Sequence, residues 1–132
     1  MRILRDEAAI AAVPEADLRQ LLQKRVAEIN ESCPWDADEL GFFIVIEPGD
    51  PVSALETEIG FPVLRGLLDD VPFGHEDFSP SFEWAEIHPE GYLELVYIVN
   101  DGGFGYDIFI ADQPGVDPEL LTMCRTYATP SV

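Results

Sequence analysis

Apolar positions along the chain predict one long amphipathic helix followed by a strand. Residues 15–31 carry an apolar stripe at the 3.6-residue period of a helix. The stripe consists of Leu18, Leu21, Leu22, Val26 and Ile29. Residues 31–39 are predicted to be a loop. Residues 40–47, LGFFIVIE, are apolar on both faces, which is typical of a strand in the middle of a sheet.

Two Asp-Pro pairs predict the starts of two further helices, because Asp caps a helix and Pro suits its first position. Asp50-Pro51 opens a short helix that ends at Ile59, with Gly60 as its stop. Asp117-Pro118 opens the last helix. Its predicted buried stripe is Leu120, Leu121, Cys124 and Tyr127. Residues 61–81 carry mixed signals and are predicted to be mostly loop, with one helical turn or short strand near residues 63–68.

Residues 82–111 contain three β-type runs, FEWAEIH, YLELVYIV and FGYDIFIA. Pro89-Glu90-Gly91 suits a three-residue hairpin loop, and Asp101-Gly102 suits a two-residue turn. The chain is therefore predicted to be a single α+β domain over residues 1–132. Its antiparallel sheet would have about four strands, with about three helices mainly on one face.

The two turns fix a strand register and hence the residues on each face. His88 would lie opposite Tyr92, Glu86 opposite Glu94, Trp84 opposite Val96, Val96 opposite Asp107 and Glu94 opposite Phe109. One face is a core face beneath the helices. It holds Leu93, Leu95, Tyr97, Val99, Phe104, Tyr106, Ile108 and Ile110.

The opposite face of the predicted meander mixes large rings with carboxylates. It holds Phe82, Trp84, Glu86, His88, Tyr92, Glu94, Val96, Ile98, Asp107 and Phe109. Glu86 and Glu94 as direct neighbours repel one another by up to about 1 kcal/mol, unless the pair receives a cation. Phe73 and Phe78 of the preceding segment would fold back over this face. The alternative is that these rings only anchor a Pro-rich connection.

Charge is unevenly distributed within a net charge of −19. Residues 1–31 carry five Lys or Arg against six Asp or Glu, whereas residues 32–132 carry two against twenty. Such a field repels nucleic acid and anionic membranes and attracts basic protein surfaces. Solubility alone, or adaptation to a salty cytoplasm, is the other explanation. Asp6 and Glu7 interrupt the apolar stretch that a signal peptide needs, which favours a cytoplasmic protein.

No motif for a metal, cofactor or covalent nucleophile is expected to be functional. His75, Glu76 and Asp77 are adjacent, and His88 shares a face with two glutamates, but neither group has the spacing of a known metal site. Cys33 and Cys124 are predicted to be unpaired and unreactive. The glycines of residues 100–105 make a turn and not a phosphate loop.

The predicted function is a non-enzymatic protein-binding module whose acidic and aromatic sheet face engages a basic partner. Antitoxin or immunity proteins and DNA mimics share this charge character, a likeness of composition and not of a family. The expected contact residues are Phe82, Trp84, Glu86, His88, Tyr92, Glu94, Asp107 and Phe109. Two alternatives stay open: a small carboxylate-based or metal-dependent enzyme on the same face, and a homodimer through its rings.

Overall fold

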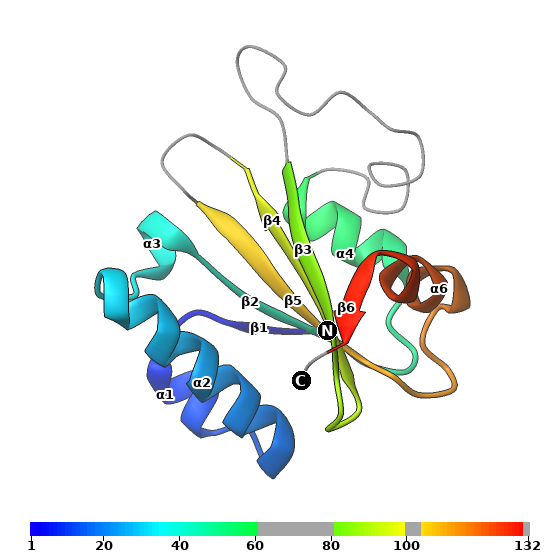
Figure 1. The fold of residues 1–132 in the computed structure, drawn as a ribbon, viewed down its shortest axis with the longest axis horizontal. Coiled ribbons are helices and arrows are strands. Elements are labelled where there is room, and N and C mark those ends of the chain that lie inside the picture. Colours follow the sequence, from blue (N-terminus) through cyan, green and yellow to red (C-terminus); the bar gives the residue numbers. More distant parts are fainter. Residues whose placement is uncertain (61–80, 100–103, 131–132) are drawn as a thin grey trace.

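The computed structural model describes residues 1–60, 81–99 and 104–130, which build one mixed sheet with helices on both faces (Figure 1). The strands are β1 (Arg2–Leu4), β2 (Gly41–Ile46), β3 (Ser81–His88), β4 (Tyr92–Ile98), β5 (Gly105–Ala111) and β6 (Ala128–Pro130). Their order in the sheet is β1-β2-β5-β4-β3-β6. The described helices are α1 (Glu7–Ala11), α2 (Ala16–Ser32), α3 (Ala37–Leu40), α4 (Val52–Ile59) and α6 (Pro118–Tyr127).

The three main helices form where the sequence predicts them. In α6 the Asp117 carboxylate accepts the backbone N–H of Glu119 at 2.9 Å, with Pro118 in the first turn. Gly60 ends α4 in a left-handed conformation, φ +87°, that favours glycine. Asp50 differs from the prediction, because its carboxylate accepts from the Glu47 N–H and pairs with the N-terminal ammonium instead of capping α4.

The predicted register of the meander is confirmed from Trp84 onward, but a register shift between Phe82 and Trp84 pairs Phe82 with Tyr97, a residue of the core face, which corrects the face predicted for position 82. Glu86 lies opposite Glu94, and Val96 lies between Trp84 on one side and Asp107 on the other. Gly91 closes the first hairpin with φ +97°, as its place in a three-residue loop requires. The second turn, Asp101-Gly102, lies outside the described residues, as does the predicted structure near residues 63–68.

The general α+β class is confirmed, but the detail of the predicted sheet is wrong. The sheet has six strands and is mixed, since β2 runs parallel to β5 and β6 runs parallel to β3. Strand β2 is paired on both sides and buried on both faces, from Gly41 to Ile46. A strand of this kind needs cover above and below, which one layer of helices cannot provide.

Helices therefore cover both faces, which corrects the expectation of one covered face. On one face α4 and α6 pack on the predicted core residues, and Leu93, Leu95, Tyr97, Ile108 and Ile110 are all buried there. On the other face α1 and α2 pack on Phe43, Val45 and Phe109. Figure 1 shows the two helix layers on opposite sides of the strands.

Four short elements were not predicted: β1, α1, α3 and β6. Arg2 of β1 links three elements, because its guanidinium binds Glu15 before α2 at 2.8 and 3.0 Å and Glu47 after β2 at 2.9 Å. Helix α3 is capped by Asp36 and occupies the end of the predicted loop 31–39 together with Leu40, which was predicted to begin the strand. Within the described ranges, no helix is both long and apolar enough to cross a bilayer.

Candidate functional site

The predicted acidic face contains a buried charge cluster centred on Arg25 of α2. The Arg25 Nε donates to Asp107 Oδ2 at 3.0 Å and lies 3.5 Å from Glu94 Oε2. Its Nη1 donates to Glu28 Oε2 at 2.8 Å, one turn further along α2. Arg25 falls between Leu21, Leu22 and Val26 in the sequence, so the packing of α2 places its side chain against β4 and β5.

His88 completes the cluster from the end of β3. Its Nε2 lies 2.8 Å from Glu94 Oε1 and its Nδ1 lies 3.3 Å from Glu86 Oε2. The imidazole stacks on Phe109, with 5.9 Å between the ring centroids. The chain itself thus supplies the cations next to these two glutamates. Arg25 lies beside Glu94, and His88, when protonated, lies beside both Glu86 and Glu94. This arrangement offsets the predicted repulsion between Glu86 and Glu94.

Burial of the cluster corrects the expectation that the whole face is open to a partner. Glu94, Asp107 and Phe109 are only 2%, 9% and 1% exposed. The physical reason is that α2 lies on this face and brings Arg25 to the two carboxyl groups. A partner cannot touch these three residues while α2 is in place, although the structure does place them on the predicted face.

The Glu94 and Asp107 carboxyl groups are buried together, and their mutual repulsion favours retention of one proton by the pair. Burial, then the charge of Glu94, raises the pKa of Asp107 well above its usual range, and Arg25 offsets this only in part. Burial also raises the pKa of Glu94. Glu94 Oε2 and Asp107 Oδ1 are buried without a hydrogen-bond partner in the described chain. A proton shared between the two groups would satisfy both oxygens.

Because of the shared proton, the free energy of unfolding should depend on pH. The folded pair keeps a proton that the unfolded chain releases above about pH 4, so this contribution is fully present at low pH and is lost as pH rises toward the folded pKa. Asp107→Asn cannot lose a proton. The free energy of unfolding of this variant, relative to that of the natural chain, should therefore rise by up to about 1.4 kcal/mol per pH unit between about pH 4 and the pKa of the folded pair. Urea unfolding at a series of pH values measures the difference.

Asp50 provides a control of the opposite sign. Burial opposes the shift, but hydrogen bonds from the N-terminal ammonium and from Glu47 lower the pKa of Asp50. The contribution of Asp50 to stability is therefore lost as pH falls. The free energy of unfolding of Asp50→Asn should rise relative to that of the natural chain only at acidic pH. A difference for Asp107→Asn that stays constant with pH would contradict the shared proton.

The part of the predicted face that remains accessible lies between α2 and β3. Trp84 is half-buried, and the Arg25 guanidinium lies over its ring at 4.8 Å from the centroid. The carboxylates of Glu28 and Glu86 are exposed by 45% and 33%. A hollow of about 50 Å³ lies among these side chains and His88, with Lys24 and Arg25 of α2 also in its wall. We call Glu28, Trp84, Glu86 and His88 the β3 strip.

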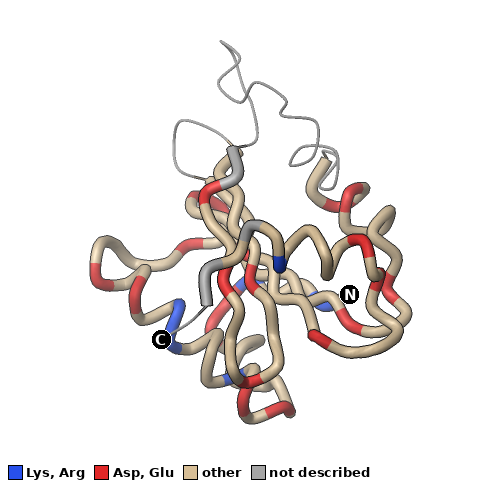
Figure 2. Tube along the Cα trace, turned by 45° about the vertical axis from the view of Figure 1, so that its right-hand side comes forward, with Lys and Arg blue, Asp and Glu red and all other residues tan. Residues whose placement is uncertain are grey.

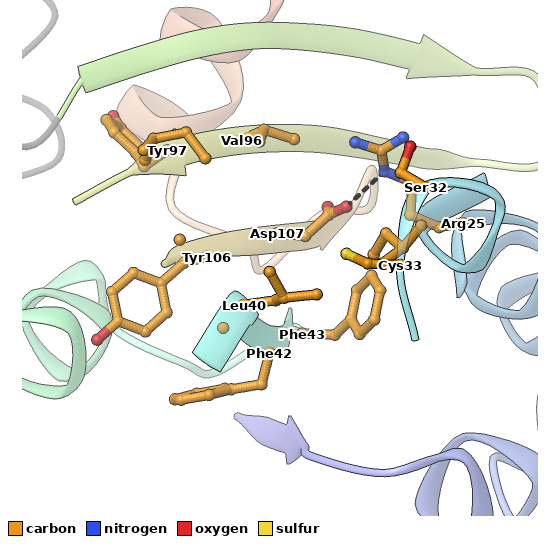
Figure 3. A pocket seen from close by; sticks show the side chains of 14 residues that line it. Arg25, Ser32, Cys33, Leu40, Phe42, Phe43, Val96, Tyr97, Tyr106 and Asp107 are labelled. Atoms are coloured by element: carbon orange, nitrogen blue, oxygen red, sulfur yellow. Dashed lines mark hydrogen bonds and ion pairs between the residues drawn. The ribbon is translucent and has the colours of Figure 1, made fainter. Parts of the chain in front are cut away.

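A larger cleft of about 280 Å³ opens beyond the C-terminal turn of α2, where the start of β2, the start of β5 and the end of β4 lie together (Figure 3). Its walls are mostly apolar, with Arg25, Asp107, Ser32 and Cys33 as the polar side chains. The apolar wall is formed by Ile29, Leu40, Phe42, Phe43, Val96, Tyr97, Ile98 and Tyr106. Gly41 and Gly105 are register partners here, and the β-carbon of any larger residue at position 41 would lie 1.6 Å from the Gly105 oxygen.

The other predicted site residues are placed as follows. Tyr92 is half-buried beside the α2 layer, and the backbone of Phe82 pairs with Tyr97 while its side chain is not described. His75, Glu76 and Asp77 lie outside the described residues. Across the described ranges, no three His, Cys, Asp or Glu side chains are grouped to hold a metal ion. Cys33 is exposed, Cys124 is buried, and both are free thiols.

The sequence prediction missed the glycine pair, and it did not identify Arg25 as the partner of Glu94 and Asp107. Arg25 lies three residues after Leu22 and four after Leu21, which places it on the same apolar face of the helix. A cation on such a face needs a buried acidic partner, and this was the signal in the sequence. Gly41 and Gly105 carry no comparable signal, because their contact depends on the unpredicted parallel pairing of β2 and β5.

Comparison of the chain with protein-family models, with curated proteins and with solved structures found no significant match.

Proposed function

We propose that the protein is a non-enzymatic acidic binding module and that its partner is a basic protein, such as a toxin or a nucleic-acid-binding protein. The observation that carries this proposal is the β3 strip. A half-buried indole, Trp84, lines an accessible part of the predicted face together with the partly exposed carboxylates of Glu28 and Glu86. An aromatic anchor with a charged rim is the usual composition of a binding hot spot.

The distribution of charge supports a basic partner. Several described cations are already paired within the chain: Arg2 with Glu15 and Glu47, Arg25 with its cluster, and Arg125 with Asp112. Figure 2 shows acidic positions on helices, turns and strands, whereas Lys and Arg positions are few. Uncompensated negative charge over a surface speeds the encounter with a cationic surface and disfavours phosphate backbones.

Charge reversal on the β3 strip tests the proposal. Glu86→Lys should weaken binding of the basic partner at least about tenfold, because a rim charge that attracts becomes one that repels. Trp84→Ala should weaken it by about 2 kcal/mol, as the loss of a central ring does. The partner is captured from a lysate of the source cells, purified, and titrated calorimetrically against each variant.

Glu58→Lys is the matched control, since Glu58 is exposed on α4, in the helix layer on the opposite face of the sheet. It changes the net charge by the same amount and should alter affinity by less than about threefold at physiological salt. Equal losses for Glu58→Lys and Glu86→Lys would mean that the whole surface attracts the partner without a docking site. Retention of no basic protein at all would reject the proposal.

A carboxylate-based enzyme is the second candidate, and one observation favours it. Asp107 is buried, favours its protonated form and lines the 280 Å³ cleft, which is the combination expected of a general acid. Turnover of chromogenic esters or glycosides that Asp107→Asn abolishes would favour this candidate over the binding module. A homodimer has less support, because in the described chain the rings of this face are buried or half-buried.

A further inference from the structure

His88 of the β3 strip has a carboxylate at each of its two ring nitrogens. Its Nε2 lies 2.8 Å from Glu94 Oε1, and its Nδ1 lies 3.3 Å from Glu86 Oε2. A neutral imidazole has one N–H donor and one acceptor nitrogen, whereas the protonated ring has two donors and an ionised carboxylate can only accept. The protonated ring can therefore satisfy both contacts, and the neutral ring can satisfy only one of them.

The difference in burial between the two glutamates decides which nitrogen keeps its proton when the ring is neutral. The side chain of Glu94 is 3% exposed and that of Glu86 is 33% exposed. A donor lost at Glu94 would leave a buried oxygen unpaired, whereas water can replace a donor lost at Glu86. The neutral ring therefore keeps the proton on Nε2, and the proton on Nδ1 goes to the solvent. The Nδ1 lone pair then faces the Glu86 carboxylate, which the ring no longer holds.

The charged groups around His88 determine what this proton does to the β3 strip. They are Lys24, Arg25 and Glu28 of α2, Glu86 of β3, Glu94 of β4 and, beside Glu94, Asp107 of β5. Strand β6 adds no charged side chain, and Tyr92, opposite His88, stays neutral because burial raises its pKa. Lys24, Arg25 and the protonated ring balance Glu28, Glu86 and the single negative charge of the Glu94–Asp107 pair. Loss of the ring proton leaves the strip with one negative charge in excess.

We propose that His88 is a pH-sensitive switch for the β3 strip. Its protonated ring holds Glu86 and weakens the binding of a basic partner, and its neutral ring releases Glu86 to that partner. Histidine side chains change their charge between about pH 5 and pH 8, so affinity should rise with pH across this range. By reciprocity, binding of a cationic surface should displace the ring proton. The role of the partner rests on the proposed function, whereas the chemistry of the ring does not.

NMR spectra of the isotope-labelled full chain test the chemistry of the ring without any partner. At about pH 8 the His88 ring should be the Nε2–H tautomer, and the carboxyl signal of Glu86 should shift over the same pH interval as the ring. His88→Gln should abolish this shift of Glu86. His75→Gln, at the only other histidine of the chain, should preserve it. An Nδ1–H tautomer in the natural chain, or a Glu86 signal that does not follow the ring, would overturn the proposal.

Hexalysine amide tests the effect of the switch on a cationic ligand, because lysine side chains keep their charge throughout this pH range. The indole N–H signal of Trp84 reports binding at the strip. Affinity should be about fivefold higher at about pH 8 than at about pH 5.5, since one rim charge is gained. In His88→Gln the difference should be less than about twofold, and His75→Gln should behave as the natural chain does. A difference that survives His88→Gln, or no shift of the indole signal at either pH, would overturn the proposal.

Failure of the proposed function would look different from failure of the switch. If a lysate yields no basic protein while the tautomer, the Glu86 signal and the hexalysine affinities behave as expected, the protein partner is rejected and the switch stands. If a basic protein is retained but its affinity shows the same pH dependence for the natural chain and for His88→Gln, the binding module stands and the switch is rejected. The tautomer is measured on the natural chain, so this test does not depend on the folding of a variant.

Discussion

Arg25→Met should lower the free energy of unfolding by about 3–5 kcal/mol, the range seen when one partner of a buried ion pair is removed. Arg25 is the only Lys or Arg in the described chain that contacts Glu94 and Asp107, and Glu94 is 2% exposed. When Arg25 is removed, the negative charge of the Glu94–Asp107 pair stays buried, with His88 as its remaining neighbour of opposite polarity. Urea unfolding at neutral pH measures the loss.

Two further variants isolate the cause of this effect. Lys24→Met removes the neighbouring exposed cation of α2 and should cost less than about 0.5 kcal/mol. Adding Glu94→Gln and Asp107→Asn to Arg25→Met should restore most of the lost stability, because no buried charge then remains. A loss below about 1 kcal/mol for Arg25→Met would show that the cluster is hydrated and that α2 is held by apolar contacts only.

Phe109→Ala should be almost as damaging, with an expected loss of about 3–5 kcal/mol. Phe109 is 1% exposed and lies between Phe43, at 6.3 Å between ring centroids, and the stacked ring of His88. Truncation would leave a cavity beneath α2 and would release His88 from its position at Glu94. Thermal and urea unfolding give the size of the loss.

Phe109→Leu serves as the matched variant, since it keeps most of the apolar volume and should cost less than about 1.5 kcal/mol. The comparison also separates two roles for this ring. A docking residue would lose partner affinity at constant stability, whereas a core residue loses stability first. Unchanged unfolding with weakened partner binding would restore Phe109 to the contact surface that the sequence predicts.

The register of the meander could be predicted because two local features determine it. The loop Pro89-Glu90-Gly91 fixes which residues pair, and strict alternation along β4 and β5 then assigns each side chain to a face. The same reasoning applies to α2 and α6, whose stripes and caps lie within the elements themselves. Each of these predictions depends on residues close together in the sequence.

The cover over the acidic face could not be predicted from the same local features. Whether α2 lies on one face or the other depends on how β2 pairs, and β2 is apolar on both faces. Its continuous apolar run is in fact typical of a parallel strand between two helix layers. Strands β1 and β6 have three residues each, too few for a periodic pattern to be recognised.

Those two short strands form the edges of the described sheet, with a consequence for behaviour at high concentration. Open-ended growth of β-structure requires a long strand with unpaired backbone groups to which another chain can add. Strands β1 and β6 have only three residues each, and Pro130 in β6 has no backbone N–H to donate, so both edges are poor templates for such growth. Salt that screens mutual repulsion between molecules should therefore yield dispersed protein or amorphous precipitate, not fibrils.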